Sequence, residues 1–287
     1  MPRPTPLFVL GTARSGTAWL ANMLSSHPDV LGLAAAEHNG VLESHLLDHT
    51  RFALAGEWTP GAFYDRYAAE DCARLAGVPR EEFCAEAPGR ADAVAFFGVL
   101  MDLAARRAGA RFWLEKTPRH AIYGDLLSRR FPTALFIIIE RRFVDTVQSQ
   151  LAAFPNPQAG WVRQRIEKVA RYGSDSRALR RLARCVPARV ATTTYEALAR
   201  DTEGEMTRLL RFLALPERPL ASRYPRRSSF GPDGASRPRL SLGERALLQT
   251  ARALCALLPL SLMVRLRERR DRRGAGTFPK FRLLVPT

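Results

Sequence analysis

"PLFVLGTARSGTAWLANML" (residues 6–24) joins an apolar run to a loop bounded by two glycines, and an amphipathic segment follows that loop. Strand, glycine-bounded loop and helix in this order predict a phosphate-binding turn, because backbone N–H groups and a helix N-terminus then face one anion. The loop reads G-T-A-R-S-G-T, with Thr17 where nucleoside triphosphate-binding loops carry a lysine. Arg14 supplies the positive charge instead, and Ser15 and Thr17 supply hydroxyl groups. The loop therefore predicts an anion site, and the missing lysine argues against ATP or GTP as its ligand.

Short apolar runs with β-branched or aromatic residues recur along the chain, at 7–10, 30–33, 112–114, 134–139 and 189–195. Runs of this kind are typical of strands buried on both faces of a parallel sheet. Segments with helical spacing alternate with them, at 92–109, 143–151, 205–215 and 244–258. The alternation predicts an α/β fold, namely an open, mostly parallel sheet flanked by helices.

The composition indicates one domain over residues 1–287, with a core at about 7–258 and an Arg-rich tail at 259–287. The net charge of +16 favours anionic ligands. Four scattered cysteines predict neither a disulfide framework nor a zinc site. The first residues carry no signal-peptide pattern, and the apolar run at 254–264 is too short for a membrane span. We therefore expect a cytoplasmic protein that is not integral to the membrane.

Two further elements place cationic side chains beside strand ends. Arg141 follows the apolar strand at 134–139, and Ser149 comes eight residues later on the next helix. An arginine and a hydroxyl group form a suitable pair for a second phosphate. Lys116 follows another predicted strand and is one of only three lysines in the chain. Ligands of parallel sheets bind at the carboxyl ends of the strands, so these residues should share one site with the loop.

In this order, "GTARSGT", "SSHPDV", "EKTPRH", "IIIERRFVDTVQS" and "TTTYEAL" make the chain resemble the sulfotransferases, above all the tyrosylprotein and related bacterial enzymes. The resemblance runs from about residue 7 to 215 and implies a P-loop-like fold that binds 3′-phosphoadenosine 5′-phosphosulfate (PAPS). It implies a product, adenosine 3′,5′-bisphosphate (PAP), and an acceptor that is a small molecule or a peptide with a hydroxyl group, an amine being the less favoured alternative. The cofactor-binding residues implied by the resemblance are Thr12, Ala13, Arg14, Ser15, Gly16, Thr17, Ala18, Arg141, Ser149 and Tyr195.

The resemblance also implies an in-line transfer in which Arg14 and Lys116 neutralise charge on the transferred group. A base must accept the acceptor's proton, and Glu37 is the preferred candidate because it is the nearest carboxylate after "HPDV". His38 and His120 remain alternatives. No metal-ligand cluster is recognisable, and none is needed for this chemistry.

The acceptor pocket is expected between residues 35–70 and 216–240, the two long loops that the cofactor motifs do not use. Trp58, Phe63 and Tyr64 suggest an apolar or aromatic acceptor. A nucleotide kinase with a variant loop is the alternative enzyme class, but no Mg²⁺-binding aspartate follows a strand. A nucleic-acid-binding protein is suggested by net charge alone, and the basic and aromatic spacing of such proteins is missing, so nucleic acid is not expected as a partner.

Overall fold

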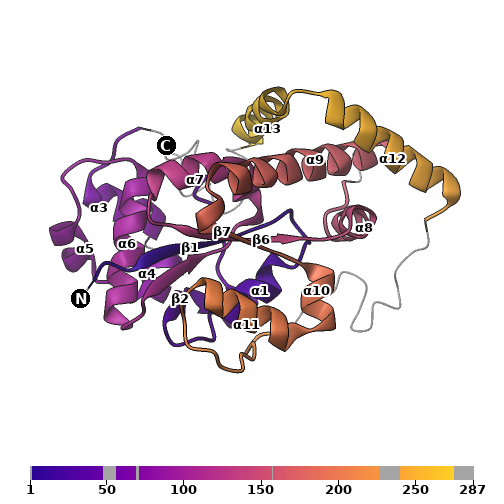
Figure 1. The fold of residues 1–287 in the computed structure, drawn as a ribbon. Coiled ribbons are helices and arrows are strands. Elements are labelled where there is room, and N and C mark those ends of the chain that lie inside the picture. Colours follow the sequence, from indigo (N-terminus) through magenta and orange to yellow (C-terminus); the bar gives the residue numbers. More distant parts are fainter. Residues whose placement is uncertain (1, 48–55, 69–70, 157, 226–239, 275–287) are drawn as a thin grey trace.

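The computed structural model describes residues 2–47, 56–68, 71–156, 158–225 and 240–274 (Figure 1). All five predicted strands are present and form one parallel sheet in the order β2-β5-β1-β6-β7. Their bounds are β1 Thr5–Leu10, β2 Val30–Gly32, β5 Phe112–Glu115, β6 Leu135–Glu140 and β7 Val190–Thr194. The prediction of an open parallel sheet with flanking helices is confirmed.

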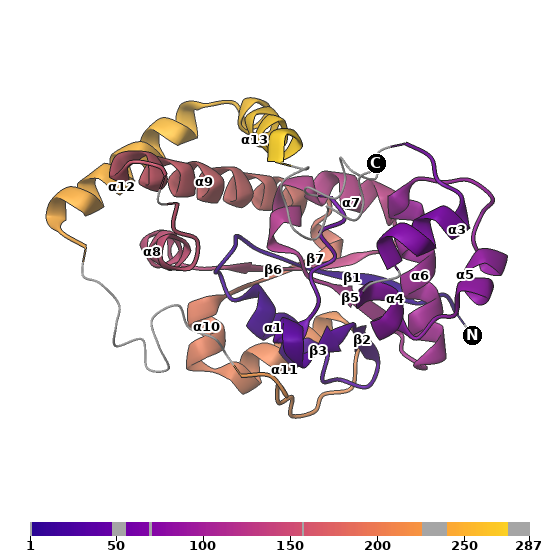
Figure 2. The same ribbon diagram turned by 180° about the vertical axis from the view of Figure 1, so that it is seen from behind.

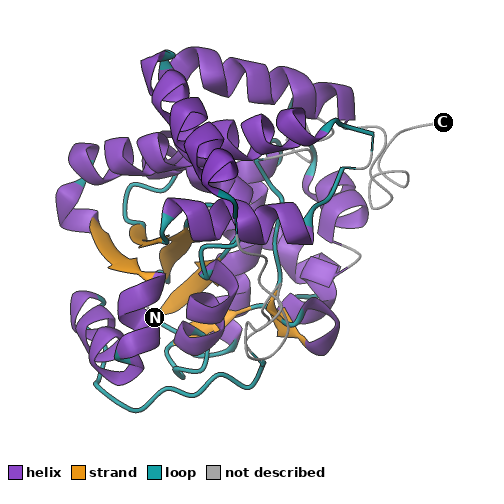
Figure 3. Ribbon diagram, turned by 90° about the vertical axis from the view of Figure 1, so that its right-hand side faces the viewer, coloured by secondary structure: helices purple, strands orange, loops and turns teal. Residues whose placement is uncertain are grey.

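Side chains of β1 alternate between two apolar layers, as expected for a strand covered on both faces. Leu7 and Val9 pack in the layer that contains α1 (Thr17–Leu24) and α11 (Thr202–Phe212). Phe8 and Leu10 pack in the opposite layer, with α6 (Ala93–Arg107) and α9 (Trp161–Cys185). Figures 1 and 3 show the strands between these two layers of helices.

The 25-residue helix α9 was not among the predicted helices. Its sequence is rich in arginine, and only a narrow line of its residues is buried, so its apolar periodicity is weak. It packs against α8 (Phe143–Ala153), α12 (Leu242–Leu257) and α13 (Leu260–Gly274) around a third apolar cluster. Figure 2 shows α12 and α13 as an outer layer over α9. Residues 260–274 of the predicted Arg-rich tail are therefore a packed helix.

Short elements connect the sheet and the large helices. A two-stranded hairpin joins β3 (Ala34–Ala35) to β4 (Gly40–Val41) through the 3₁₀ turn η1 (Ala36–His38). The remaining elements are α3 Pro60–Phe63, the π-helical turn η2 Tyr64–Ala68, α4 Asp71–Ala76, α5 Arg80–Glu86, η3 Pro118–Tyr123, α7 Gly124–Arg130, η4 Pro187–Arg189 and α10 Tyr195–Arg200.

Within the described part of the chain, no single helix is both long and apolar enough to cross a membrane. Helices α12 and α13 reach the required length and composition only as a pair, and they are bent by 106° at the break between them.

The parallel arrangement brings the segments that follow all five strands to one edge of the sheet. Strand β1 lies between β5 and β6, so the chain crosses from one half of the sheet to the other at β1. Open α/β sheets bind their ligands at such a crossing point, outside the carboxyl ends of the strands.

Candidate active site

A cavity of about 630 Å³ lies at this edge of the sheet. Residues in the segments that follow the five strands line this cavity. The described lining residues are Ala13, Arg14, Gly16, Thr17, Ala18, Trp19, Asn22, His38, Asn39, Glu43, His45, Lys116, Pro118, Arg119, Arg141, Ser149, Phe154, Lys168, Arg171, Tyr195 and Pro225. Six of these side chains are lysine or arginine, and Glu43 is the only carboxylate among them. The described wall therefore favours an anionic ligand.

The loop after β1 has an unusual backbone at its cationic residue. Arg14 has a φ of 70°, a left-handed conformation that is uncommon for a residue with a side chain. Gly16 has a φ of 104°, and a Cβ atom built on it would lie 2.7 Å from Cδ2 of Tyr195. Only glycine fits there, so the aromatic ring can approach the loop backbone closely. Strained loops of this kind concentrate at ligand sites.

Residues at the end of β6 and on α8 hold this loop. Arg14 Nε donates to Ser149 Oγ at 3.3 Å, and Arg141 donates to the Arg14 carbonyl at 3.1 Å. Buried Gln150 donates to the Ala13 carbonyl at 2.9 Å. The Arg141 guanidinium lies 4.2 Å from the ring centre of Tyr195. The two predicted phosphate elements thus form one connected structure.

Two cations lie close together at this end of the cavity. Burial and the charge of Arg141 lower the pKa of Arg14, and the charges of Glu43 and Tyr195 partly oppose that effect. An arginine so placed remains protonated at neutral pH. The paired positive charges can be offset by an anionic ligand, which is the electrostatic signature of a phosphate site.

Lys116 reaches the cavity from the end of β5 and is almost completely buried, with 4% of its side chain exposed. Its Nζ donates to Glu43 Oε1 at 2.7 Å. Glu43 follows β4, and its side chain remains 35% exposed. A lysine and a carboxylate thus meet in the cavity wall, beside the loop that carries Arg14.

The hairpin ahead of Glu43 is attached to the phosphate-loop helix. Asn22 on α1 accepts from the Val41 N–H at 2.9 Å and donates to the Asn39 carbonyl at 3.0 Å. Asn39 and Gly40 both have positive φ, at 55° and 114°. These contacts couple the position of the hairpin to the helix that follows the loop.

Glu115, which sequence reasoning did not single out, is buried at the end of β5, directly before Lys116. Its carboxylate is buried and accepts hydrogen bonds from Ser44 at 2.7 Å and from Thr117 at 2.5 Å, and His120 lies 3.0 Å away. Burial opposes ionisation, but His120 and the two hydroxyl donors outweigh it and lower the pKa of Glu115 to about 2. Glu115 therefore connects Ser44, which follows Glu43, with Thr117, which follows Lys116.

Replacing Glu115 with glutamine is expected to lower the free energy of unfolding by on the order of 3 kcal/mol at pH 7. The folded-state pKa lies below the ordinary value of 4.5, so the stabilisation is present above pH 4.5 and is lost as the pH falls towards 2. Urea unfolding at pH 7 and pH 3 should show the difference from wild type shrinking on acidification. A difference of equal size at both pH values would contradict the role of this charge. Glu86→Gln, an exposed partner of Arg106, is the control.

The structure brings most of the predicted site residues together. Ala13, Arg14, Gly16, Thr17, Ala18, His38, Lys116, Arg141, Ser149 and Tyr195 all line the cavity. Thr12 and Ser15 are buried in the loop rather than exposed in its wall. The Ser15 hydroxyl has no hydrogen-bond partner among the described residues.

Two of the predicted base candidates lie elsewhere. Glu37 does not line the cavity, and its exposed carboxylate pairs with Arg74 at 2.7 Å. His120 is buried, with Nδ1 toward Glu115 and Nε2 accepting from the Leu47 N–H at 3.1 Å. Both ring nitrogens of His120 are thereby engaged away from the described cavity wall.

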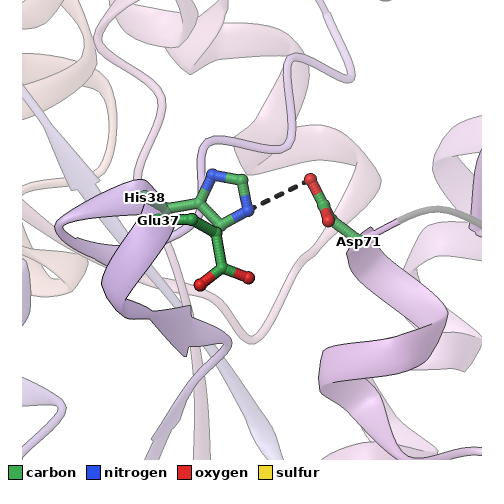
Figure 4. A group of neighbouring side chains, drawn as sticks. All are labelled: Glu37, His38 and Asp71. Carbon is green, nitrogen blue, oxygen red and sulfur yellow. Dashed lines mark ion pairs between the residues drawn. The ribbon is translucent and has the colours of Figure 1, made fainter.

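Figure 4 shows Glu37, His38 and Asp71, whose ligand atoms lie within 4.8 Å of one another. His38 Nε2 lies 3.0 Å from Asp71. Arg74 contacts both carboxylates, at 2.7 Å from Glu37 and 3.2 Å from Asp71. A cation in this group would compete with the arginine, so the cluster is accounted for as an ion-pair network.

The aromatic residues expected at the acceptor pocket have another role. Phe63 is fully buried and packs on Phe83 and Phe96. Tyr64 donates to the Val78 carbonyl at 2.6 Å, and Trp58 packs against the same core cluster. These three side chains pack in the core beside α6 and are not among the described lining residues of this cavity. The two expected loops do contribute other residues, from His38 to His45 and at Pro225, while residues 48–55 and 226–239 lie outside the described part.

Comparison with known proteins gives one family. The model of the sulfotransferase family matches residues 6–219. The sulfotransferase domain from the curacin biosynthetic pathway superposes with a TM-score of 0.53 at 15% identity, covering 93% of this chain and 97% of that one. The sulfotransferase domain from the Synechococcus PCC 7002 olefin synthase gives 0.52 at 17% identity, with 94% and 96% covered. Sulfotransferase STF9 from Mycobacterium avium gives 0.51 at 16%, with 97% and 78% covered. At these identities the likeness is one of fold, and no curated protein matches.

Proposed function

Because this chain belongs to the sulfotransferase family, we propose that it transfers the sulfuryl group of PAPS to a hydroxyl group of an acceptor. The observation that carries the proposal is the single cavity in which two phosphate-binding elements meet the Lys116–Glu43 pair. A nucleotide kinase is less well supported, because Thr17 occupies the loop position of the kinase lysine and the family match is to sulfotransferases.

The residues of the cavity fit PAPS. The loop has three features of a loop built around an anion: the left-handed Arg14, the glycine-only position 16, and a buried Ser15 hydroxyl with no partner in the described part of the chain. The loop would hold the phosphosulfate, and Arg141 with Ser149 would hold the 3′-phosphate. Tyr195, against both Gly16 and Arg141, would contact the cofactor between them. When bound, PAPS supplies an activated sulfuryl group and leaves as PAP.

We assign the general base to Glu43 in preference to Glu37. Glu43 lines the cavity, lies beside Lys116 and interacts electrostatically with Arg14, whereas Glu37 is an exposed partner of Arg74. Glu43 would accept the proton of the acceptor hydroxyl as its oxygen attacks sulfur. Lys116 and Arg14 would offset the negative charge that develops on the transferred group. His38 is the second candidate, because it lines the same cavity with Asp71 beside it.

The protein is expected to bind PAP more tightly than AMP or ATP, because it offers a separate partner for the 3′-phosphate. Arg141→Ala should weaken PAP binding by about 10–100-fold, the loss of a charge-assisted hydrogen bond of roughly 1.5–3 kcal/mol. Its affinity for AMP should change much less. Isothermal titration calorimetry of the three nucleotides measures both effects. Arg142→Ala is the matched control, because Arg142 is exposed and does not line the cavity. Equal wild-type affinities for AMP and PAP would refute the proposed cofactor.

A further inference from the structure

Arg119, Lys168 and Arg171 form a second cationic group in the wall of the cavity, here called the α9 cluster. Lys168 and Arg171 lie on α9, and Arg119 lies on η3, directly after the Lys116 segment. The chain has three lysines, and two of them, Lys116 and Lys168, line this one cavity. Lys168 and Arg171 lie outside the segments that carry the cofactor motifs, and Arg119 is three residues beyond Lys116 in the segment EKTPRH.

The α9 cluster has electrostatic surroundings of its own. The charges that act most on Arg14 are those of Arg141, Glu43 and Tyr195. Those that act most on Arg171 are Arg267, Arg119, Asp175 and Arg270. The cluster therefore interacts mainly with charges on α9, η3 and α13, whereas Arg14 interacts mainly with residues at the phosphate loop and with Glu43.

Positive charge exceeds negative charge around Arg171. Burial and the charges of the neighbouring arginines together lower the pKa of Arg171 to about 10, although the charge of Asp175 opposes them. The buried carboxylate of Asp175 is the ion-pair partner of Arg267. Burial and the charge of Arg171 also lower the pKa of Lys168, whose Nζ donates to the Phe154 carbonyl at 3.0 Å. Lys168 is only 8% exposed, so its charge is held in the wall rather than extended into solvent.

Buried like charges are unfavourable unless an opposite charge offsets them. PAPS would be met by Arg14, Arg141 and Lys116 at the proposed cofactor end, and Glu43 already pairs with Lys116. The α9 cluster thus carries positive charge beyond what the cofactor elements provide, in the same cavity as the proposed base.

We propose that the α9 cluster binds a phosphate or sulfate group of the acceptor, so that the substrate is a hydroxyl compound that already carries such an anion. This inference rests on the proposed function and names the substrate class of the same cavity. It replaces the apolar or aromatic acceptor suggested by Trp58, Phe63 and Tyr64, which pack in the core.

The test uses the full-length protein saturated with PAP, which blocks the nucleotide end, and measures binding of radiolabelled inorganic phosphate by equilibrium dialysis. Wild type should bind phosphate saturably, and the double variant Lys168→Met/Arg171→Met should bind it roughly tenfold or more weakly. Arg171→Lys should retain much of the binding because it keeps the charge. Arg180→Met, on the exposed face of α9, is the matched control and should bind like wild type.

Phosphate binding that persists in the double variant would belong to the sulfuryl position near Lys116 and would overturn the inference. Absence of phosphate binding by the PAP-saturated wild type would overturn it as well. PAP binding in the same samples reports on the proposed function separately, since a protein that binds PAP but not phosphate loses only the acceptor assignment. A thermal unfolding curve of each variant establishes that it is folded.

Competition then distinguishes the sources of such an anion. Glycerol 3-phosphate should displace the labelled phosphate if the acceptor is a free phosphorylated compound. Vesicles containing phosphatidic acid should displace it if the anion belongs to a lipid headgroup. Glycerol alone and phosphatidylcholine vesicles, which lack an anionic phosphate monoester, should displace neither.

Discussion

Replacing Glu43 with glutamine is expected to slow sulfuryl transfer by about 10²–10⁴-fold while the affinity for PAP changes little. Glutamine keeps the size of the side chain and can still accept the Lys116 hydrogen bond, which is 2.7 Å in the wild type. It cannot take up the acceptor's proton. Single-turnover rates at saturating PAPS, with calorimetry of PAP binding, separate the two effects.

Glu37→Gln is the matched control for this experiment. Glu37 lies in the turn of the hairpin and Glu43 follows its second strand, but Glu37 is exposed and pairs with Arg74 outside the described cavity wall. Its replacement should leave the transfer rate near that of wild type. A large loss in Glu37→Gln with a near-normal rate in Glu43→Gln would return the base to the residue predicted from sequence. A loss confined to His38→Ala would assign the base to that histidine.

The fold was predictable because its strands are continuous apolar runs, such as 7–10 and 134–139, that a parallel sheet buries on both faces. Helix α9 was not predicted, because its few buried residues form no continuous apolar pattern. Its stability depends on a narrow seam of contacts with α8 and α12, and its sequence is dominated by charged side chains. The single-domain prediction remains a prediction.

That the residues of the proposed cofactor end lie close together could be predicted, because they lie on local sequence patterns. Arg14 is within the loop, and Arg141 and Ser149 follow one strand directly. Glu43, the base proposed here, was not among the predicted site residues, because its position in the cavity wall depends on the hairpin that ends at β4. The Asn39–Gly40 pair is typical of a hairpin turn. A hairpin predicted at this pair places Glu37 within the turn and Glu43 beyond the second strand, which makes Glu43 a further candidate.

The residues proposed to bind the acceptor could not be grouped from the sequence, because contacts between distant segments bring them together. Lys168 and Arg171 reach the cavity because α9 packs across α8 and η3. Glu115 accepts hydrogen bonds from Thr117, two residues away, and from Ser44, 71 residues away. No spacing in the sequence links Ser44 to Glu115, or α9 to the strand ends.

Replacing Lys116 with methionine is expected to reduce the transfer rate by about 10²–10³-fold, the usual effect of removing one charge-stabilising donor. Methionine retains the length of the side chain and suits a position that is 4% exposed. Lys116→Arg keeps the positive charge and should recover part of the rate. Single-turnover measurements over a range of PAPS concentrations separate the rate constant from the cofactor affinity. A normal rate at saturation with weakened PAPS binding would show that Lys116 serves binding alone.

The double variant Glu43→Gln/Lys116→Met tests whether the two residues act as a pair. Because their side chains are 2.7 Å apart, the effects of the single variants should not be additive. Once Lys116 has been removed, losing the Glu43 carboxylate should slow the reaction by a smaller factor than it does in the wild type. Combining Glu37→Gln with Lys116→Met is the control, and there the rate should equal that of Lys116→Met alone. Full additivity for Glu43 and Lys116 would mean that the ion pair in the cavity wall has no part in the proposed transfer.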